Sequence, residues 1–183
     1  MTFISYKHKL TPHKSSASAH KSWDVSNLLL SYNTGFDVEF GVTSPGKEGL
    51  DLKDSFFEYS KTADLWQGSC FELFIKIDEK YWEWNFTPSG RSHHYFFEGW
   101  RNRISSSVGG AVITGDGGIV KASIDASAYP LLQWYLLNRP KETVVEYQCS
   151  CILKVGGEKS YWSSRINPSE DPNFHSPDSF LVL

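Results

Sequence analysis

The chain has 183 residues and a formal net charge of -3, and its 18 Lys and Arg residues are scattered rather than clustered. This length suits one domain with a substantial core, while the charge pattern argues against nucleic acid as a partner. No apolar run has the length of a membrane span and the N-terminus lacks the pattern of a secretory signal, so we expect one cytoplasmic domain over residues 1–183 without a membrane partner.

The predicted strands are short segments in which apolar and polar residues alternate. In chain order they cover residues 28–32, 36–42, 71–77, 81–87, 94–99, 111–114, 118–124, 144–155, 160–166 and 180–183. Aromatic residues make up 15% of the chain and favour such pleated, half-buried surfaces. Turn sequences rich in Gly, Pro, Asn and Asp separate the segments. This pattern predicts an all-β fold, an antiparallel β-sandwich.

Helical patterns are scarce in this sequence. Residues 23–30 are compatible with one or two turns, and residues 130–137 predict a short helix with Pro130 in its first turn. We expect the polar segment 15–22 to be mobile. The segment 167–179 is dense in Pro, Asn, Asp and Ser, which predicts an ordered loop that leads into the last strand.

The segments 71–77 and 81–87 form a predicted β-hairpin with two different faces. Pairing of Ile77 with Lys80 puts the apolar residues of both strands on one face, whereas a slip by one residue would separate them. Burial therefore selects this register. The apolar face, which we predict to be core, consists of Phe71, Leu73, Ile75, Trp82, Trp84 and Phe86.

The opposite face of the hairpin mixes carboxyl, amide and aromatic groups. The register sets Glu72 opposite Asn85 and Phe74 opposite Glu83. Carboxylates and amides bind hydroxyl groups, and flat rings pack against the C–H faces of a sugar ring, so this face suits a polyhydroxylated ligand. Carboxylates on strands are more often solvated or paired with Lys or Arg, and a purely structural role is the competing interpretation.

Several blocks of sequence carry a family resemblance. They are residues 65–66 with 70–74, residues 81–90, residues 95–101 and, near the end, residues 161–162, 167–168 and 171–180. These blocks cover most of the chain from Trp66 onward. Through them the chain resembles the DOMON-like superfamily. More narrowly, it is similar to the family 9 carbohydrate-binding modules and their stand-alone DOMON-like relatives. The resemblance implies a β-sandwich that captures the end of a sugar chain between two aromatic rings.

The resemblance also implies a set of site residues. Trp66 matches one ring of the sugar-binding slot and Glu72 matches a carboxylate that binds hydroxyl groups. The ligand-binding residues that follow are Trp66, Glu72, Asn85, Arg101, Trp162 and His175. The second ring stays open among Trp162, Phe174 and Trp100. For Arg101, a buried ion pair with Glu72 or Glu83 is as good an interpretation as a ligand contact.

Two other functions compete with the binding of a saccharide. Some DOMON domains bind haem, often through Met and His, but here Met occurs only at position 1 and the neighbours His93 and His94 point to opposite faces of a strand, which disfavours haem. A glycoside-acting enzyme could use Glu72 and Glu83 as its carboxylate pair, with His175 as a base. No nucleophile elbow, phosphate loop or metal-ligand motif accompanies them, so we expect a protein without catalytic residues.

No cofactor is predicted from the sequence. Some family members hold structural calcium, and calcium stays open here although no Asp-rich loop has the required spacing. Cys149 and Cys151 lie two apart in a predicted strand and point to the same face, and their parallel side chains do not converge on a metal. Together with Cys70 they are predicted to be small buried hydrophobes. We therefore expect no metal ligands among the site residues.

Overall fold

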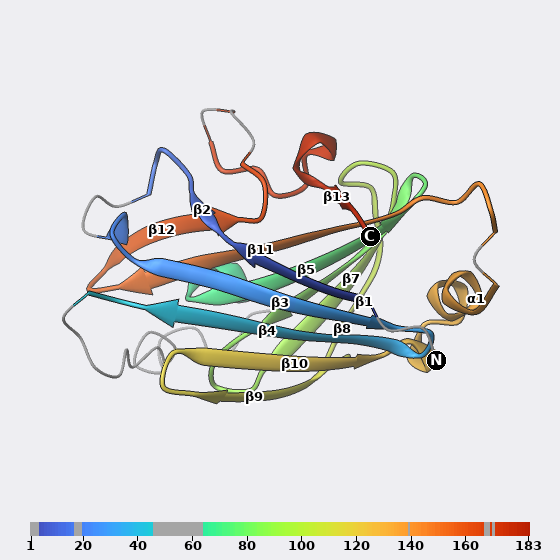
Figure 1. Ribbon diagram of the computed structural model, residues 1–183, viewed down its shortest axis with the longest axis horizontal. Coiled ribbons are helices and arrows are strands. Elements are labelled where there is room, and N and C mark those ends of the chain that lie inside the picture. The colour runs from blue at the N-terminus through green and yellow to red at the C-terminus, as the bar shows by residue number, and fades with distance from the viewer. Residues whose placement is uncertain (1–3, 17–19, 46–63, 139, 167–168, 170) are drawn as a thin grey trace.

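The computed structural model describes residues 4–16, 20–45, 64–138, 140–166, 169 and 171–183. Within these residues, two antiparallel sheets pack face to face (Figure 1), which confirms the predicted β-sandwich. Sheet A has the strand order β1 (Ile4–Lys9), β3 (Asp24–Tyr32), β4 (Gly35–Thr43), β10 (Ile119–Asp125) and β9 (Val112–Asp116). Sheet B has the order β2 (Thr11–Pro12), β12 (Glu158–Ser163), β11 (Val145–Val155), β5 (Cys70–Ile77), β6 (Lys80–Phe86), β7 (Ser92–Glu98) and β8 (Arg103–Val108), and β13 (Leu181–Val182) pairs with β11.

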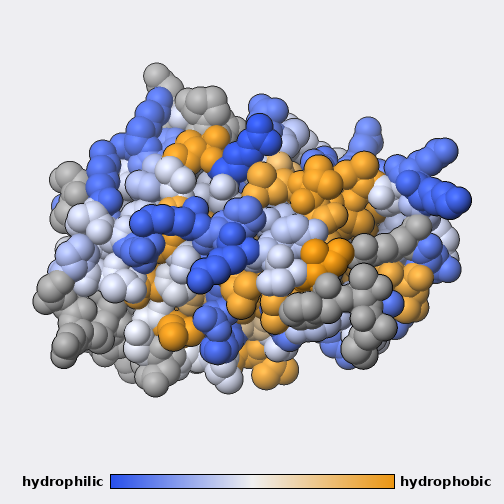
Figure 2. Space-filling view, viewed as in Figure 1, coloured by the Kyte–Doolittle hydropathy of each residue, from blue (hydrophilic) through white to orange (hydrophobic). Residues whose placement is uncertain are grey.

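The helical elements are short. The α-helix α1 (Pro130–Asn138) confirms the prediction for 130–137, and three 3₁₀ turns are present in the described chain: η4 (Leu65–Gln67), η5 (Ala126–Ala128) and η6 (Pro177–Ser179). Helix α1 buries Leu132 and Leu136 and leaves Leu131, Trp134 and Leu137 exposed. Figure 2 shows that hydrophobic residues gather on the side of the molecule where α1 and the C-terminus lie. No helix among the described residues has the length and apolar character that a membrane span requires.

The prediction of a helical turn over 23–30 is wrong, because residues 24–30 belong to strand β3. Val25, Asn27, Leu29 and Ser31 point inward at every second position. Because Asn27 and Ser31 are polar, the alternation of apolar and polar residues that predicts a strand is not visible in this segment. Strands β1, β2 and β8 were not predicted at all. All six residues of β8 are exposed, so that strand carries no apolar alternation.

The hairpin of β5 and β6 has the predicted register. Ile77 pairs with Lys80, and the pairing continues so that Glu72 lies opposite Asn85 and Phe74 opposite Glu83. The predicted apolar face lies in the core between the sheets. There the indole of Trp84, fully buried, donates a hydrogen bond from Nε1 to the Tyr129 hydroxyl at 2.9 Å.

The three cysteines are free and buried, as predicted. Cys149 and Cys151 belong to the core between the sheets. Burial raises the pKa of the Cys149 thiol, and it also raises the pKa of Cys70 and of Cys151. The thiols therefore stay protonated and behave as small hydrophobic groups.

A second cluster covers the outer face of sheet B. It consists of Phe74, Tyr81, Tyr95, Phe97 and Phe180, with Trp66 and Phe174 packed against it. The C-terminal segment lies over this face through η6 and the pairing of β13 with β11. Of the predicted loop 167–179, residues 167, 168 and 170 lie outside the described residues.

The polar segment 15–22 is tied to sheet B in its described part. The Ser16 hydroxyl donates to the carbonyl of Tyr161 at 3.0 Å, and His20 Nδ1 lies 3.1 Å from the Ser160 hydroxyl. Ser16 and His20 are both buried. Residues 17–19 lie outside the described residues.

A close backbone approach at Gly35 leads to a first prediction. Gly35 begins β4 with φ of 153°, and a Cβ there would lie 2.0 Å from the carbonyl oxygen of Ile124 in β10. We expect Gly35→Ala to lower the free energy of unfolding by more than about 1 kcal/mol, because the backbones must move apart. Gly90 is the control, since it has φ of 89° and no atom within 4 Å of the added Cβ. Urea denaturation that gives equal losses for Gly35→Ala and Gly90→Ala would contradict the steric argument.

Candidate functional site

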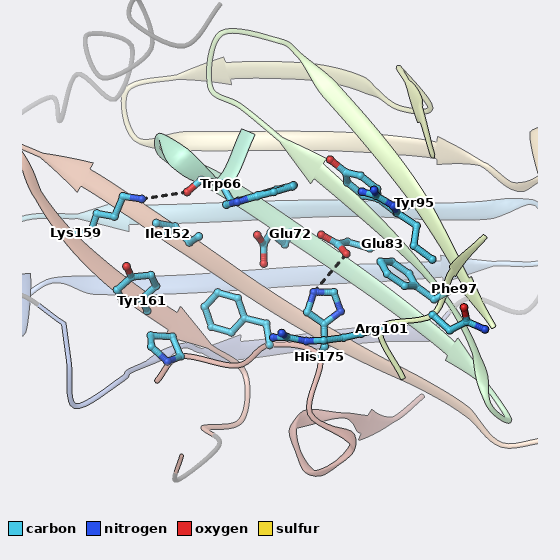
Figure 3. Close-up of a pocket in the computed structure, with 14 residues that line it drawn as sticks. Trp66, Glu72, Glu83, Tyr95, Phe97, Arg101, Ile152, Lys159, Tyr161 and His175 are labelled. Atoms are coloured by element: carbon cyan, nitrogen blue, oxygen red, sulfur yellow. Dashed lines mark hydrogen bonds and ion pairs between the residues drawn. The ribbon is translucent and has the colours of Figure 1, made fainter. Parts of the chain in front are cut away.

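A cavity of about 830 Å³ opens on the outer face of sheet B. Its volume falls within the range of about 300–1,000 Å³ typical of small-molecule sites. Strands β5, β6, β7, β11 and β12 form the floor, while η4, the turn at 101–103 and the loop at 172–175 form the walls (Figure 3). The lining consists of Trp66, Glu72, Glu83, Tyr95, Phe97, Arg101, Asn102, Arg103, Ile152, Lys159, Tyr161, Pro172, Phe174 and His175.

Two buried carboxyl groups, those of Glu72 and Glu83, lie on the cavity floor. Strand alternation turns both away from the core, since their neighbours on β5 and β6 fill it. The Ser150 hydroxyl donates to Glu72 Oε2 at 2.8 Å, and Asn85 Nδ2 donates to Glu83 Oε1 at 3.0 Å. Figure 3 shows the two carboxyl groups side by side between Trp66 and His175. They are held in place and still face the cavity.

Burial favours the neutral form of both acids. It raises the pKa of Glu72 to about 7, and the hydrogen bond from Ser150 opposes this only in part. Burial raises the pKa of Glu83 well above its usual range, and the nearby Glu72 raises it further. Like charges held close together in a dry site do not both ionise. At neutral pH the floor therefore carries at least one protonated carboxyl group.

His175 approaches the floor from the loop above it. Its Nε2 lies 3.7 Å from Glu83 Oε2, and its Nδ1 lies 3.0 Å from the Tyr81 hydroxyl. Burial, followed by the charge of Arg101, lowers the pKa of His175 to about 4. Because His175 is neutral at pH 7 and Glu83 favours its protonated form, their contact is one of polar neutral groups and not an ion pair.

Aromatic rings surround the two carboxyl groups. The rings of Trp66 and Tyr95 are 6.1 Å apart with an angle of 55°, and His93 stacks under Tyr95 at 4.6 Å. Tyr81 and Phe97 stack at 4.4 Å with nearly parallel planes. These contacts fix the rings before any ligand arrives, so a flat apolar surface is preformed next to the polar floor.

The two neighbouring histidines of β7 separate as the strand alternation predicts. His93 lies on the cavity side of sheet B, where it stacks on Tyr95, while His94 contacts Tyr129 edge-on in the core. Among the described residues, no group of three or more His, Cys, Asp and Glu side chains lies close enough to hold a metal ion.

Basic side chains line the rim of the cavity. Arg101 has a left-handed backbone with φ of 54°, a conformation that costs a non-glycine residue about 1–3 kcal/mol. Its N–H donates to the Tyr81 hydroxyl and its Nη2 donates to Asn173 Oδ1, both at 3.1 Å. The guanidinium of Arg103 lies 5.7 Å from the centre of the Tyr95 ring. On the other side, Lys159 Nζ donates to the Trp66 carbonyl at 3.4 Å.

The structure brings four of the six predicted site residues to this cavity: Trp66, Glu72, Arg101 and His175. Asn85 is fully buried and does not line the cavity, and its side-chain contact is the hydrogen bond that it donates to Glu83. Trp162 is on the opposite face of β12, in the core, where it is 1% exposed and its Nε1 donates to Ser160. Because it faces the other sheet, Trp162 is not placed to contact a ligand in the cavity.

The structure also shows where Arg101 and the candidates for the second ring lie. Arg101 pairs with Asn173 and not with a carboxylate, so the ion-pair interpretation does not describe its contacts. Phe174 lines the cavity, whereas Trp100 is 61% exposed and does not.

Several lining residues were missed by sequence reasoning. These are Tyr95, Phe97, Asn102, Arg103, Ile152, Lys159, Tyr161 and Pro172. Glu83 in β6 pairs with Tyr95 in β7, and this pairing is the signal that could have identified Tyr95 and Phe97 as lining residues. It requires the strand order, which the sequence does not contain.

One solved structure has a similar fold across nearly the whole chain. It is the crystal structure described as that of "a putative carbohydrate-binding protein" from Bacteroides uniformis, with a TM-score of 0.60 and 12% sequence identity over 97% of this chain and 84% of that chain. The shared feature is the fold. Comparisons of the sequence with protein-family models and with curated proteins found no match.

Proposed function

We propose that the protein binds a saccharide or a similar polyhydroxylated small molecule in the cavity on sheet B, without altering it chemically. The observation that carries this proposal is the position of two buried carboxyl groups, Glu72 and Glu83, directly beside the preformed rings of Trp66 and Tyr95. The description of the Bacteroides uniformis protein as a carbohydrate-binding one is in keeping with it.

The chemistry of the floor matches that of a sugar hydroxyl. A hydroxyl group both donates and accepts hydrogen bonds. A protonated carboxyl group donates while an ionised one accepts, so the pair of Glu72 and Glu83 offers both roles in one place. The C–H face of the sugar ring would lie against Trp66, and the burial of the two carboxyl groups strengthens each hydrogen bond that they form.

The sequence resemblance to family 9 carbohydrate-binding modules supports a more detailed proposal. In those modules two rings hold the end of a sugar chain, and here Trp66 would supply one ring. Phe174 is our candidate for the second, because it lines the same cavity while Trp162 lies in the core. We therefore propose a DOMON-like slot closed by Trp66 and Phe174.

Removal of the Trp66 ring tests the binding site. We expect Trp66→Ala to weaken saccharide binding by about tenfold, which corresponds to about 1.4 kcal/mol and to the loss of one ring contact. The measurement is titration calorimetry with a panel of mono- and oligosaccharides. Trp134→Ala is the matched control, because Trp134 is exposed on α1 outside the cavity. Unchanged affinity in Trp66→Ala, or no binding of any saccharide to the wild-type protein, would refute the proposed site.

Hydrolysis of a glycoside is the second candidate function. Burial and the nearby Glu72 hold Glu83 toward its protonated form, which suits a general acid at neutral pH. Glu72, with a pKa of about 7, would then serve as the partner carboxylate. Incubation with chromogenic glycosides separates the two candidates, since a binding protein releases no chromophore and an enzyme releases it at a rate that Glu72→Gln abolishes.

A further inference from the structure

The rim of the cavity carries more positive charge than its floor can balance. Arg101, Arg103 and Lys159 all line the cavity. In the part of the chain that the structure describes, none of these three forms an ion pair with a carboxylate. Lysines elsewhere do so: Lys9, Lys76, Lys80 and Lys121 each pair with an Asp or Glu. Three cationic side chains that are not neutralised by a carboxylate contact therefore line this one cavity.

The floor does not supply the missing negative charge. Glu72 and Glu83 face the same space, but burial holds both toward the protonated state and the two do not ionise together. His175 contributes no charge, because burial keeps it neutral at pH 7. Three cations therefore line a cavity whose floor carries at most about one negative charge at neutral pH, so the side chains that line it carry a net positive charge.

Two of the cations are placed together at one end. The Arg103 N–H donates to the Arg101 carbonyl at 3.1 Å, so both belong to one tight turn. Tyr81 and Asn173 hold Arg101 in its left-handed conformation. A strained conformation that neighbouring residues maintain is typical of a side chain with a task in binding. Here it directs a guanidinium group to the cavity (Figure 3).

We propose that the ligand carries an oxyanion, a carboxylate or a phosphate attached to the sugar, and that Arg101 and Arg103 bind it. Guanidinium groups present paired N–H donors that match the oxygens of both anions. The uncharged part of the ligand would lie beside Trp66, over the carboxyl groups of Glu72 and Glu83 on the cavity floor. This inference rests on the proposed function and specifies the class of saccharide.

Titration calorimetry with matched sugars tests the inference. The probes are glucose, glucuronate and glucose 6-phosphate, which share a ring and differ in charge, together with inorganic phosphate, which lacks the ring. We expect at least one of the two anionic sugars to bind about tenfold or more tightly than glucose, and the advantage to shrink between 50 and 500 mM NaCl because salt screens charge attraction. The glucuronate and phosphate arms identify which oxyanion the site prefers.

Variants of the two arginines complete the test. Arg101→Gly and Arg103→Met should each remove most of the preference for the anionic sugar. The first also relieves the left-handed backbone, so thermal unfolding should show a protein at least as stable as the wild type. Arg165→Met is the matched control, since Arg165 is exposed outside the cavity and should keep the preference.

The outcomes separate this inference from the proposed function. Equal affinity for neutral and anionic sugars, or an anionic preference that survives in Arg101→Gly and Arg103→Met, overturns the oxyanion site and leaves the binding of saccharides standing. No binding of these sugars or of the wider saccharide panel overturns both. Binding of inorganic phosphate alone, with no gain from the attached sugar, also overturns the proposed pairing of an oxyanion with a sugar ring.

Discussion

Replacement of Trp84 by alanine is expected to lower the free energy of unfolding by about 3–5 kcal/mol, the range for removal of a large aromatic side chain from a core. Trp84 is fully buried on β6 between the two sheets. Its Nε1–H donates to the Tyr129 hydroxyl, and the two rings meet edge-on at 5.3 Å. The substitution therefore leaves a cavity and also removes a donor from a buried hydroxyl group.

Urea denaturation followed by far-UV circular dichroism measures this effect. Trp134→Ala is the control, because Trp134 is 51% exposed on α1 and should lose less than about 1 kcal/mol. If Trp84→Ala folds too poorly for measurement, Trp84→Phe, which keeps most of the volume, should show a smaller loss. Equal stability of Trp84→Ala and Trp134→Ala would contradict the assignment of Trp84 to the core.

Glu72→Gln is expected to stabilise the protein at pH 8, by up to about 3 kcal/mol, and to have little effect at pH 4.5. Burial raises the pKa of Glu72 from 4.5 in the unfolded chain to about 7 in the folded protein. Between these values the folded state holds a proton that the unfolded state has lost, so stability falls as the pH rises from about 4.5 to about 7. Each pKa unit corresponds to about 1.4 kcal/mol, and glutamine avoids this loss because it has no charge.

The test is a series of denaturation curves between pH 4 and pH 8 for the wild type and for Glu72→Gln. The variant should show a flatter dependence on pH, because Ser150 can still donate to the amide oxygen. Glu98→Gln is the control, since the Glu98 carboxylate is 56% exposed and should change stability by less than about 1 kcal/mol at any pH. A variant that loses stability at pH 8 would show that the ionised carboxylate supports the fold.

The buried position of Glu72 also bears on function. A buried acid that lowers stability at neutral pH is a poor structural choice, and positions of this kind are characteristic of binding and catalytic sites. We therefore expect the stabilised Glu72→Gln variant to bind saccharide less tightly than the wild type. A gain in stability together with a loss in affinity would identify Glu72 as a residue kept for its chemistry.

The hairpin of β5 and β6 shows what could be predicted from the sequence. Two apolar rows, three residues each, can be buried together in only one register, and this constraint also determined that Glu72 and Glu83 share the other face. The prediction worked because local alternation and burial point to the same arrangement. No knowledge of the remaining strands was needed for it.

Trp162 shows where the same reasoning fails. The neighbours Tyr161 and Trp162 point to opposite faces of β12, and only the pairing of Trp162 with Cys151 in β11 places it in the core. Either residue could have been the one at the site. The turn at 101–103 and the loop at 172–175 were harder still, because irregular segments have no periodicity from which a side-chain direction follows. The direction of these side chains depends on contacts between segments that are far apart in the sequence.

The alternation along β5 and β6 has a consequence for how such a protein can change. Odd and even positions of one strand serve separate purposes, so a substitution at position 72 or 83 can alter which molecule is bound while the residues between them keep the two sheets together. Variation in recognition is therefore available in single steps that leave the architecture intact. A library restricted to positions 72 and 83, the two positions of these strands that line the cavity, should yield mostly folded proteins with new specificities.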